Sequence, residues 1–249
     1  MKIGLFIPCF MNELYPEVCK ATYKILKNQD LDIDYPLSQT CCGQPMANSG
    51  CAKDVKQLAI SFVNTFKDYD YIVAPSGSCV SMVKEHYSEF FNDDKDYNKV
   101  KASIYEVCEF LHDVIKLENV KFSHSFPYKV GLHNSCHGHR VLKLATASEL
   151  NIPYNSKLKN LLNKVEGIEL VTLRREDECC GFGGTFSVAE EAVSVAMGKD
   201  RIKDHLDSSA QIMTGADMSC LMHMDGIINR DKNPIKVMHI VEILAGVRP

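Results

Sequence analysis

The sequence predicts an α/β fold with two homologous domains, each a small parallel sheet flanked by helices, related by a pseudo-two-fold duplication. The first observation is a cysteine pattern, C…CCG…C, that occurs once in each half of the 249-residue chain. The second is the alternation of short apolar runs with amphipathic helical stretches, which is typical of parallel sheets covered on both faces. The third is a repeat period near half the chain length, which indicates two domains rather than a solenoid. We expect these domains to span residues 1–120 and 125–249.

Segments around the cysteines repeat as well. Residues 2–9 match 129–136, residues 78–82 match 219–223, and residues 107–111 match 240–244. The two halves should therefore contain the same elements in the same order.

In the first half, continuous apolar runs predict strands at residues 3–8, 32–37, 71–75 and 104–105. Apolar side chains at helical spacing predict helices at 13–26, 54–66 and 106–115. Residues 118–127 are the expected linker.

The second half is expected to follow the same course. Strands are predicted at residues 130–133, 168–173, 211–214 and 237–238, and helices around 141–150, 188–206 and 240–245. Residues 151–164 have the composition of a polar loop with some helical content.

The composition limits the classes of function. Hydrophobic residues make up 45% of the chain, charged residues 24%, and the net charge is −4. This is typical of a soluble globular protein and carries no basic excess for nucleic-acid binding. No apolar run approaches the roughly 18–20 residues that cross a bilayer, and the N-terminus leads directly into a strand rather than a signal peptide. We expect a cytoplasmic protein without a membrane span.

Eleven cysteines are many for a cytosolic chain, where metal or redox chemistry explains them better than disulfides. Two adjacent cysteines can face one centre only across a turn. Gly43 and Gly181 follow the two adjacent pairs and supply that turn, because glycine accepts positive φ. The eight repeated cysteines are the candidate ligands: Cys9, Cys41, Cys42, Cys79, Cys136, Cys179, Cys180 and Cys220.

Each group of four cysteines should converge on one point. Cys9 and Cys79 each follow a predicted strand, and ligands of open parallel sheets collect at the carboxyl ends of the strands. Four thiolates suit either Zn²⁺ or an iron–sulfur cluster. Because neither half has the paired C-x₂₋₄-C knuckles of structural zinc, we favour an iron–sulfur cluster of the 4Fe–4S type, up to one per domain. Zinc in one domain is the alternative.

Residues near the pattern have plainer interpretations. Three cysteines outside the repeat are expected to be buried small apolar side chains: Cys19, Cys51 and Cys108. Gly183 and Gly184 lack the remainder of a phosphate-binding motif, and we expect them to let the backbone approach a cluster. Arg174 and Arg175 are expected to be solvated.

Three histidines crowd Cys136 in the sequence: His133, His137 and His139. One of them could ligate a metal ion. We favour a different role, in which they cap the strand or donate hydrogen bonds to the cluster sulfurs.

The repeated C…CCG…C pattern resembles the cysteine-rich CCG domain family, found in the B subunit of heterodisulfide reductase and the iron–sulfur subunit of glycolate oxidase. In that family the last motif is often C-x-x-C, and the five cysteines of heterodisulfide reductase support non-cubane clusters. Here Ser76 and Asp217 stand at the position of the fifth cysteine. This departure argues against disulfide-reducing chemistry and leaves open whether either residue is a ligand.

A finer resemblance rests on residues 75–79, 133–138, 178–187 and 215–223, which are similar to the lactate utilisation protein A family (LutA or LldE). The resemblance implies an iron–sulfur electron-transfer subunit of a three-protein complex that oxidises L-lactate to pyruvate. The implied partners are a ferredoxin-containing LutB-like subunit and a smaller LutC-like subunit, through which the protein could associate peripherally with a membrane. It also implies a subunit that is not catalytic alone. The alternatives are a heterodisulfide-type thiol–disulfide reductase subunit and a zinc-holding structural adaptor.

Overall fold

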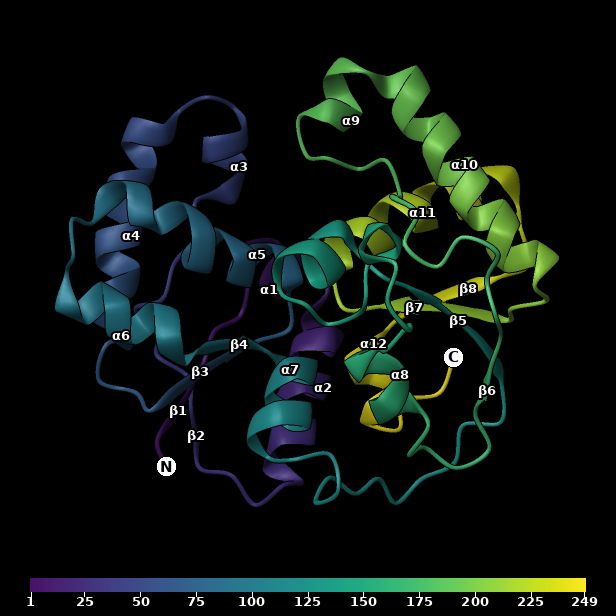
Figure 1. The fold of residues 1–249 in the computed structure, drawn as a ribbon, viewed down its shortest axis with the longest axis horizontal. Coiled ribbons are helices and arrows are strands. Elements are labelled where there is room, and N and C mark those ends of the chain that lie inside the picture. The colour runs from purple at the N-terminus through teal and green to yellow at the C-terminus, as the bar shows by residue number, and fades with distance from the viewer.

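The computed structural model describes all residues from 1 to 249 and contains two four-stranded parallel sheets (Figure 1). The first has the strand order β2-β1-β3-β4, and the second the order β6-β5-β7-β8. Since each sheet places its own second strand at one edge and its first strand next to it, the two halves share one topology. The predicted α/β duplication is confirmed, and the boundaries 1–120 and 125–249 remain our proposal.

The first half contains four strands and their covering helices. The strands are β1 (Ile3–Leu5), β2 (Ile33–Asp34), β3 (Tyr71–Ala74) and β4 (Ile104–Glu106). The α-helices are α1 (Cys9–Leu14), α2 (Pro16–Lys27), α3 (Gln44–Asn48), α4 (Ala52–Phe66), α5 (Gly77–Ser81), α6 (Lys95–Ser103) and α7 (Val107–Glu109). Two π-helical segments, η1 (Met82–His86) and η3 (Phe110–Val114), and one 3₁₀ helix, η2 (Tyr87–Phe90), complete this half.

The second half repeats this order with different helix lengths. Its strands are β5 (Lys129–His133), β6 (Glu169–Leu170), β7 (Ile212–Gly215) and β8 (Lys236–His239). Its helices are α8 (Lys157–Leu162), α9 (Phe186–Ala189), α10 (Glu191–Asp207), α11 (Met218–Asp231) and α12 (Ile240–Leu244), with the turns η4 (His137–Val141) and η5 (Ser148–Leu150).

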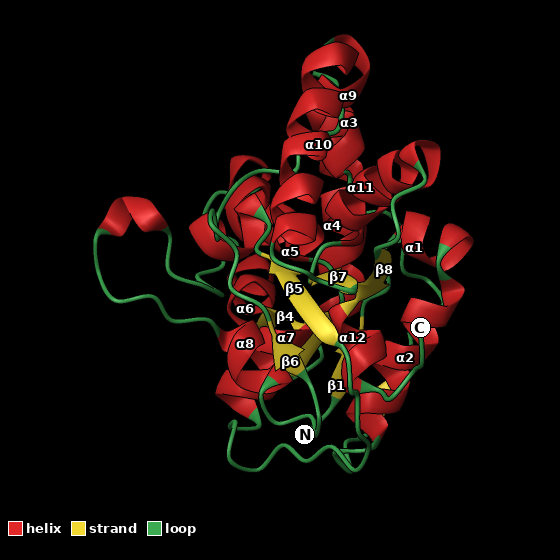
Figure 2. Ribbon diagram, turned by 90° about the vertical axis from the view of Figure 1, so that its right-hand side faces the viewer, coloured by secondary structure: helices red, strands yellow, loops and turns green.

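The strands are buried between helices, as Figure 2 shows. In β1, Ile3 pairs in parallel register with Ile33 of β2 and Tyr71 of β3, and its side chain is fully buried. Helix α4 turns Val55, Ala59 and Phe62 towards the core, which follows from their helical spacing. The continuous apolar runs of the sequence are thus explained by strands covered on both faces.

The two halves pack against each other rather than standing apart. A single cluster of 60 buried apolar residues extends through both of them. Helix α2 of the first half lies against α12 of the second, where Lys24 Nζ donates a hydrogen bond to the carbonyl of Ala245 at 2.9 Å. None of the helices is both long enough and apolar enough to cross a membrane.

Several predicted elements differ in extent from the structure. The helix expected at 141–150 is wrong: residues 142–147 are irregular, and Lys143 has a φ of 57°. Tertiary hydrogen bonds override the local preference here, because Leu144 donates to Gly138 and accepts from Lys157, each at 2.8 Å. The strands expected at 32–37 and 168–173 are shorter in the structure, where only the two-residue edge strands β2 and β6 form. Residues 13–26 divide into two helices at Tyr15, and the loop at 151–164 contains α8.

Candidate metal centre

The first group of four cysteines gathers at the carboxyl edge of the first sheet. Cys9 begins α1 shortly after β1, and Cys79 lies in α5, just beyond β3. Cys41 accepts hydrogen bonds from the thiols of Cys9 and Cys42, and Cys42 is also hydrogen-bonded to Cys79. All four sulfur atoms therefore belong to one chain of contacts.

The second group repeats this arrangement. The thiolate of Cys179 accepts hydrogen bonds from Cys136 and Cys180, and Cys180 is also hydrogen-bonded to Cys220. The backbone N–H of Gly181 lies 3.4 Å from the sulfur of Cys179, as that of Gly43 does from Cys41. The structure thus brings together each of the two predicted groups, and their role as ligands remains a prediction.

The turn after each cysteine pair needs glycine. Gly43 has a φ of 83° and Gly181 a φ of 88°, in the left-handed region that favours glycine. A Cβ atom on Gly181 would also lie 2.6 Å from the carbonyl oxygen of Ser194. Since this turn aims two adjacent sulfurs at one centre, it is the local feature that makes the pair usable as ligands.

Hydrogen bonding divides the thiols of each group into two kinds. The pKa of Cys41 is lowered to about 2 by hydrogen bonds from Cys42 and Cys9, and the pKa of Cys179 is lowered to about 2 by Cys136 and Cys180. The thiols that donate these bonds have raised pKa values because they face a thiolate: Cys9, Cys42, Cys136 and Cys180. A cation at the centre would take the place of those protons and stabilise all four sulfurs as thiolates.

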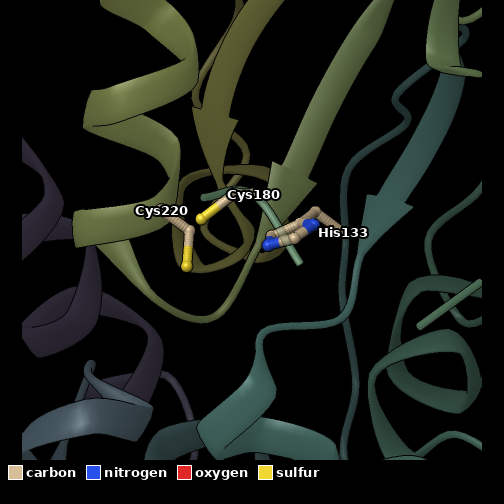
Figure 3. Close-up of side chains that lie close together, drawn as sticks. All are labelled: His133, Cys180 and Cys220. Carbon is tan, nitrogen blue, oxygen red and sulfur yellow. The ribbon is translucent and has the colours of Figure 1, made fainter. Parts of the chain in front are cut away.

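A histidine reaches the second group only. A ring nitrogen of His133 and the sulfurs of Cys180 and Cys220 all lie within 4.8 Å of one another, with the ring directed towards Cys180 (Figure 3). His133 is 1% exposed, and its Nε2 has no hydrogen-bond partner. Burial lowers the pKa of His133 to about 3, and the charge of Arg201 acts in the same direction, so the ring is neutral. Of the other two histidines, His137 is partly exposed and His139 is buried.

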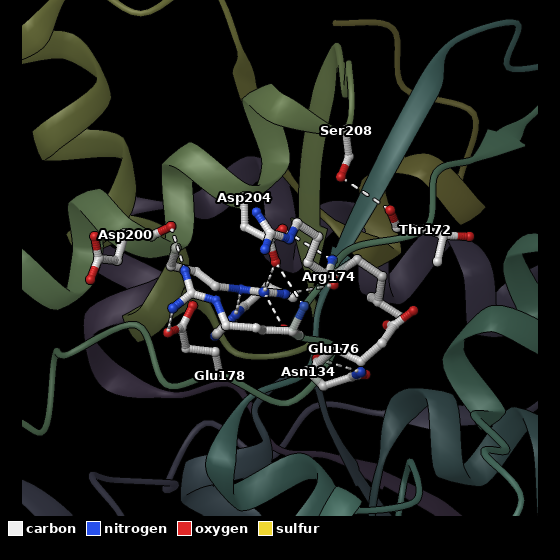
Figure 4. A network of polar contacts seen from close by, with 12 residues as sticks. Asn134, Thr172, Arg174, Glu176, Glu178, Asp200, Asp204 and Ser208 are labelled. Atoms are coloured by element: carbon white, nitrogen blue, oxygen red, sulfur yellow. Dashed lines mark hydrogen bonds and ion pairs between the residues drawn. The ribbon is translucent and has the colours of Figure 1, made fainter.

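Sequence reasoning missed a buried polar network on α10. Arg201 is fully buried and donates to Asp204 at 3.1 Å and to the carbonyl of Arg175 at 2.5 Å. Asp204 also accepts the backbone N–H groups of Arg174 and Arg175, at 3.0 and 3.1 Å (Figure 4). In the sequence, Arg201 and Asp204 look like a solvated helix face. Alignment of the two halves could have identified this pair, because the matching helix α4 buries the aromatic residues Phe62 and Phe66 on the corresponding face.

The two residues at the fifth-cysteine position form hydrogen bonds with N–H and hydroxyl groups rather than with a sulfur. Asp217 accepts two hydrogen bonds from Ser78, from the backbone N–H at 2.9 Å and from Oγ at 3.1 Å, and a third from Ser219 at 2.9 Å. Ser76 accepts the N–H of Cys79 at 3.3 Å. Asp217 therefore joins the two halves between their cysteine groups, and Ser76 caps α5.

The remaining expectations are partly corrected. Cys108 is buried and Cys19 half-buried, but Cys51 is exposed, so its predicted burial is wrong; it precedes α4 in a surface turn. Arg174 and Arg175 are exposed, as expected. At Gly184 the close neighbour is Asn48 of the first half: a Cβ would lie 3.0 Å from its side-chain nitrogen. The segments that follow the two CCG turns thus meet each other.

The donors present fit a sulfur-ligated centre in each half. Four sulfurs joined by hydrogen bonds form a soft donor set in each half, and backbone N–H groups donate to them. In the second half the buried, unpartnered Nε2 of His133 lies beside that set. Soft thiolate sites select zinc or iron–sulfur clusters over hard cations. The arrangement can therefore hold a metal ion or a cluster.

Comparison with known proteins agrees with this geometry. The family model of the cysteine-rich domain named CCG matches residues 3–84 and 130–225. "Lactate utilization protein A" of Geobacillus thermodenitrificans is 40% identical over 248 residues, with 98% of both chains covered. The protein of the same name from Halalkalibacterium halodurans is 39% identical, with 98% of this chain and 96% of that protein covered. A putative Asp/Glu racemase from Yersinia pestis aligns at 12% identity with a TM-score of 0.37, too slight a likeness to bear on fold or function. The duplicated cysteine sites and these matches together show that the chain belongs to the CCG cysteine-rich domain family and, within it, to the lactate utilization protein A family.

Proposed function

We propose that this protein serves lactate utilisation as an iron–sulfur electron-transfer subunit of a three-protein complex that oxidises L-lactate to pyruvate. The names of the relatives support the lactate role. The observation that carries the electron-transfer role is the pair of four-sulfur groups, each at the carboxyl edge of a parallel sheet. Its partners would be a ferredoxin-containing LutB-like subunit and a smaller LutC-like subunit, and eleven free thiols suit the reducing cytoplasm.

The chain's residues divide the work of holding such centres. The eight repeated cysteines would ligate one 4Fe–4S cluster in each half. When bound, such a cluster supplies a store for single electrons. The N–H groups of Gly43 and Gly181 donate to the sulfurs of Cys41 and Cys179, which offsets their negative charge. Asp217 and Ser78 hold the two halves together between the sites.

The same chemistry argues that lactate is oxidised elsewhere in the complex. Converting lactate to pyruvate removes two electrons and a hydride-like hydrogen, whereas iron–sulfur centres accept electrons singly, so a second cofactor is needed. The chain carries no flavin or nicotinamide fingerprint. We therefore expect it to pass electrons on without turning over lactate alone.

The test begins with iron and sulfide analysis of protein purified without oxygen. We expect about four iron atoms and four sulfides per occupied half, as 4Fe–4S clusters require. The loaded protein is then assayed for lactate-dependent dye reduction, first alone and then with its two partners. Activity should require the partners.

Each other outcome counts against the proposal in a different way. Stoichiometric zinc without sulfide would favour the structural adaptor. Robust turnover of lactate by the isolated chain would place the substrate site in this subunit. Reduction of a disulfide substrate would favour the heterodisulfide-type reductase, against which Ser76 and Asp217 stand in place of the fifth cysteines.

A further inference from the structure

The two cysteine groups are backed by different side chains, although the halves repeat. Behind the first group, Phe6 of the segment after β1 packs edge-on against two rings of α4. The ring centroids of Phe6 and Phe62 are 4.9 Å apart, and those of Phe6 and Phe66 are 5.8 Å apart. Tyr87 packs on Phe62 in the same cluster, and its hydroxyl donates to the carbonyl of Cys42 at 2.9 Å. No charged or imidazole side chain stands at the position of Phe6.

In the second half the matching positions are polar. His133 stands in the repeat where the first half has Phe6, and it contacts Arg201 of α10 as Phe6 contacts Phe62. All the polar side chains at this place are buried, with Arg201 at 0% and His133 at 1% exposed. Polar groups that replace an aromatic cluster in a buried position need a reason, because their desolvation is unfavourable.

Arg201 determines which nitrogen of His133 carries the proton. Its Nε–H donates to Nδ1 of His133 at 3.2 Å. A guanidinium group has donors only, so Nδ1 must be the acceptor and the proton of the neutral ring lies on Nε2. That nitrogen has no hydrogen-bond partner within the chain.

The same contact excludes His133 as a ligand. A metal-ligating histidine donates its second ring N–H to a carboxylate or carbonyl, which leaves a lone pair for the metal. Here the second nitrogen faces a donor instead. The group presented to Cys180 and Cys220 is thus an N–H.

The charge of Arg201 is largely balanced. Its guanidinium pairs with Asp204 at 3.1 Å, and the carboxylate of Asp204 is itself satisfied by the N–H groups of Arg174 and Arg175. Besides the charge of Arg140, which acts on Cys136, the electrostatic difference between the two sites is therefore the N–H donor of His133.

We propose that His133, oriented by Arg201, donates its Nε2–H to a thiolate of Cys180 or Cys220, and that the C-terminal centre is in consequence the more easily reduced of the two. A hydrogen bond to a ligand sulfur stabilises the additional negative charge of the reduced state. One electron enters from a one-electron donor, and no bond is made or broken. Electrons that enter the protein would come to rest in the second half. This inference rests on the proposed function, since it requires a cluster in each half.

Two single-site proteins test the inference. The double variant Cys41→Ser/Cys42→Ser keeps only the C-terminal site, and Cys179→Ser/Cys180→Ser keeps only the N-terminal one. Both are reconstituted, their iron is measured, and the cluster is titrated with dithionite while the electron paramagnetic resonance signal is followed. We expect the C-terminal site to have the higher reduction potential.

Substitution of His133 then isolates the hydrogen bond. In the protein that keeps the C-terminal site, His133→Phe recreates the aromatic side chain of the first half. It should shift the reduction equilibrium about tenfold towards the oxidised state, which is about 59 mV for one electron. Phe6→Leu in the other single-site protein is the matched control and should leave its potential unchanged, because it removes no donor.

A spectroscopic readout keeps the inference testable if His133→Phe does not fold. In the protein that keeps the C-terminal site, prepared with ¹⁵N-labelled histidine, pulsed resonance methods should detect a weak coupling from the cluster to a histidine nitrogen across the hydrogen bond. This coupling is distinct from the exchangeable protons that the backbone N–H groups of Gly181 and Phe182 contribute. A strong coupling to a directly bonded nitrogen would instead make His133 a ligand and overturn the inference. Equal potentials in two iron-loaded proteins would also overturn it and leave the proposed function standing. Absence of iron from both single-site proteins and from the unsubstituted chain would refute the proposed function itself.

Discussion

At the scale of single residues, Cys41 and Cys179 hold the key place in each site. Each is the one sulfur that accepts hydrogen bonds from two neighbouring thiols and from a backbone N–H. The exposed Cys51 and the buried Cys108 belong to neither group. The cysteines therefore separate into two structural classes, which substitution can distinguish.

We expect serine at a repeated cysteine to remove one of the two centres. A hydroxyl is a harder and less acidic donor than a thiol, so the altered site should hold iron poorly, and iron per reconstituted chain should fall by about half. The test uses four variants: Cys41→Ser, Cys42→Ser, Cys179→Ser and Cys180→Ser. The controls Cys19→Ser and Cys108→Ser should keep full iron. Equal iron in all six proteins would show that the ligand assignment is wrong.

At the scale of elements, the loop that enters α9 depends on one backbone conformation. Gly181 has a φ of 88° and lies against the first turn of α10, where the hydroxyl of Ser194 donates to its carbonyl at 2.8 Å. Gly50 has a similar φ of 81° but open space around it. The two glycines thus have the same backbone requirement and differ in packing.

Gly181→Ala should destabilise the protein more than Gly50→Ala. In both variants the alanine must adopt the left-handed backbone conformation, which costs about 1–2 kcal/mol. Only the Cβ at position 181 also meets a neighbour, at 2.6 Å from the carbonyl oxygen of Ser194. Urea unfolding of the two variants measures the difference, and Gly181→Ala should lose iron from the second site as well. If the two variants unfold at the same urea concentration, packing at Gly181 contributes nothing.

At the scale of the whole molecule, the two halves are joined by polar and apolar contacts. Asp217 of the second half accepts two hydrogen bonds from Ser78 of the first, and Gly77 donates to the carbonyl of Ala216 at 3.3 Å. The apolar cluster continues from one half into the other. We infer that the halves unfold as one unit and that Asp217 stabilises their contact.

Asp217→Ala should lower the free energy of unfolding by about 1–3 kcal/mol, because it leaves the buried N–H of Ser78 without an acceptor. Urea unfolding followed by circular dichroism measures this change. Ser219→Ala is the control: Ser219 also donates to Asp217, at 2.9 Å, but its removal leaves the contact between the halves intact. A loss no greater than that of Ser219→Ala would contradict the role of Asp217.

The success of prediction differed from element to element for physical reasons. Residues 71–75 and 54–66 were predicted well because their periodicity and their burial agree. The segment 142–147 was predicted wrongly because its hydrogen bonds go to Gly138 and Lys157 instead of along a helix. The edge strands β2 and β6 came out shorter than predicted, because each forms only two residue pairs with its neighbour, whereas the opposite edge strands β4 and β8 form three and four.

The sequence by itself determined the duplication, the parallel α/β class and the composition of the two cysteine groups, because repeats, periodicity and spacing are properties of chain order. Only the tertiary structure decided that Asp217 bonds Ser78 across the halves, that Cys51 is exposed, and that Arg201 lies buried against His133. Each of these depends on how distant segments pack or on which surfaces remain uncovered. A single chain position does not record its neighbours in space, and in this protein those neighbours make two repeated sites electrostatically unequal.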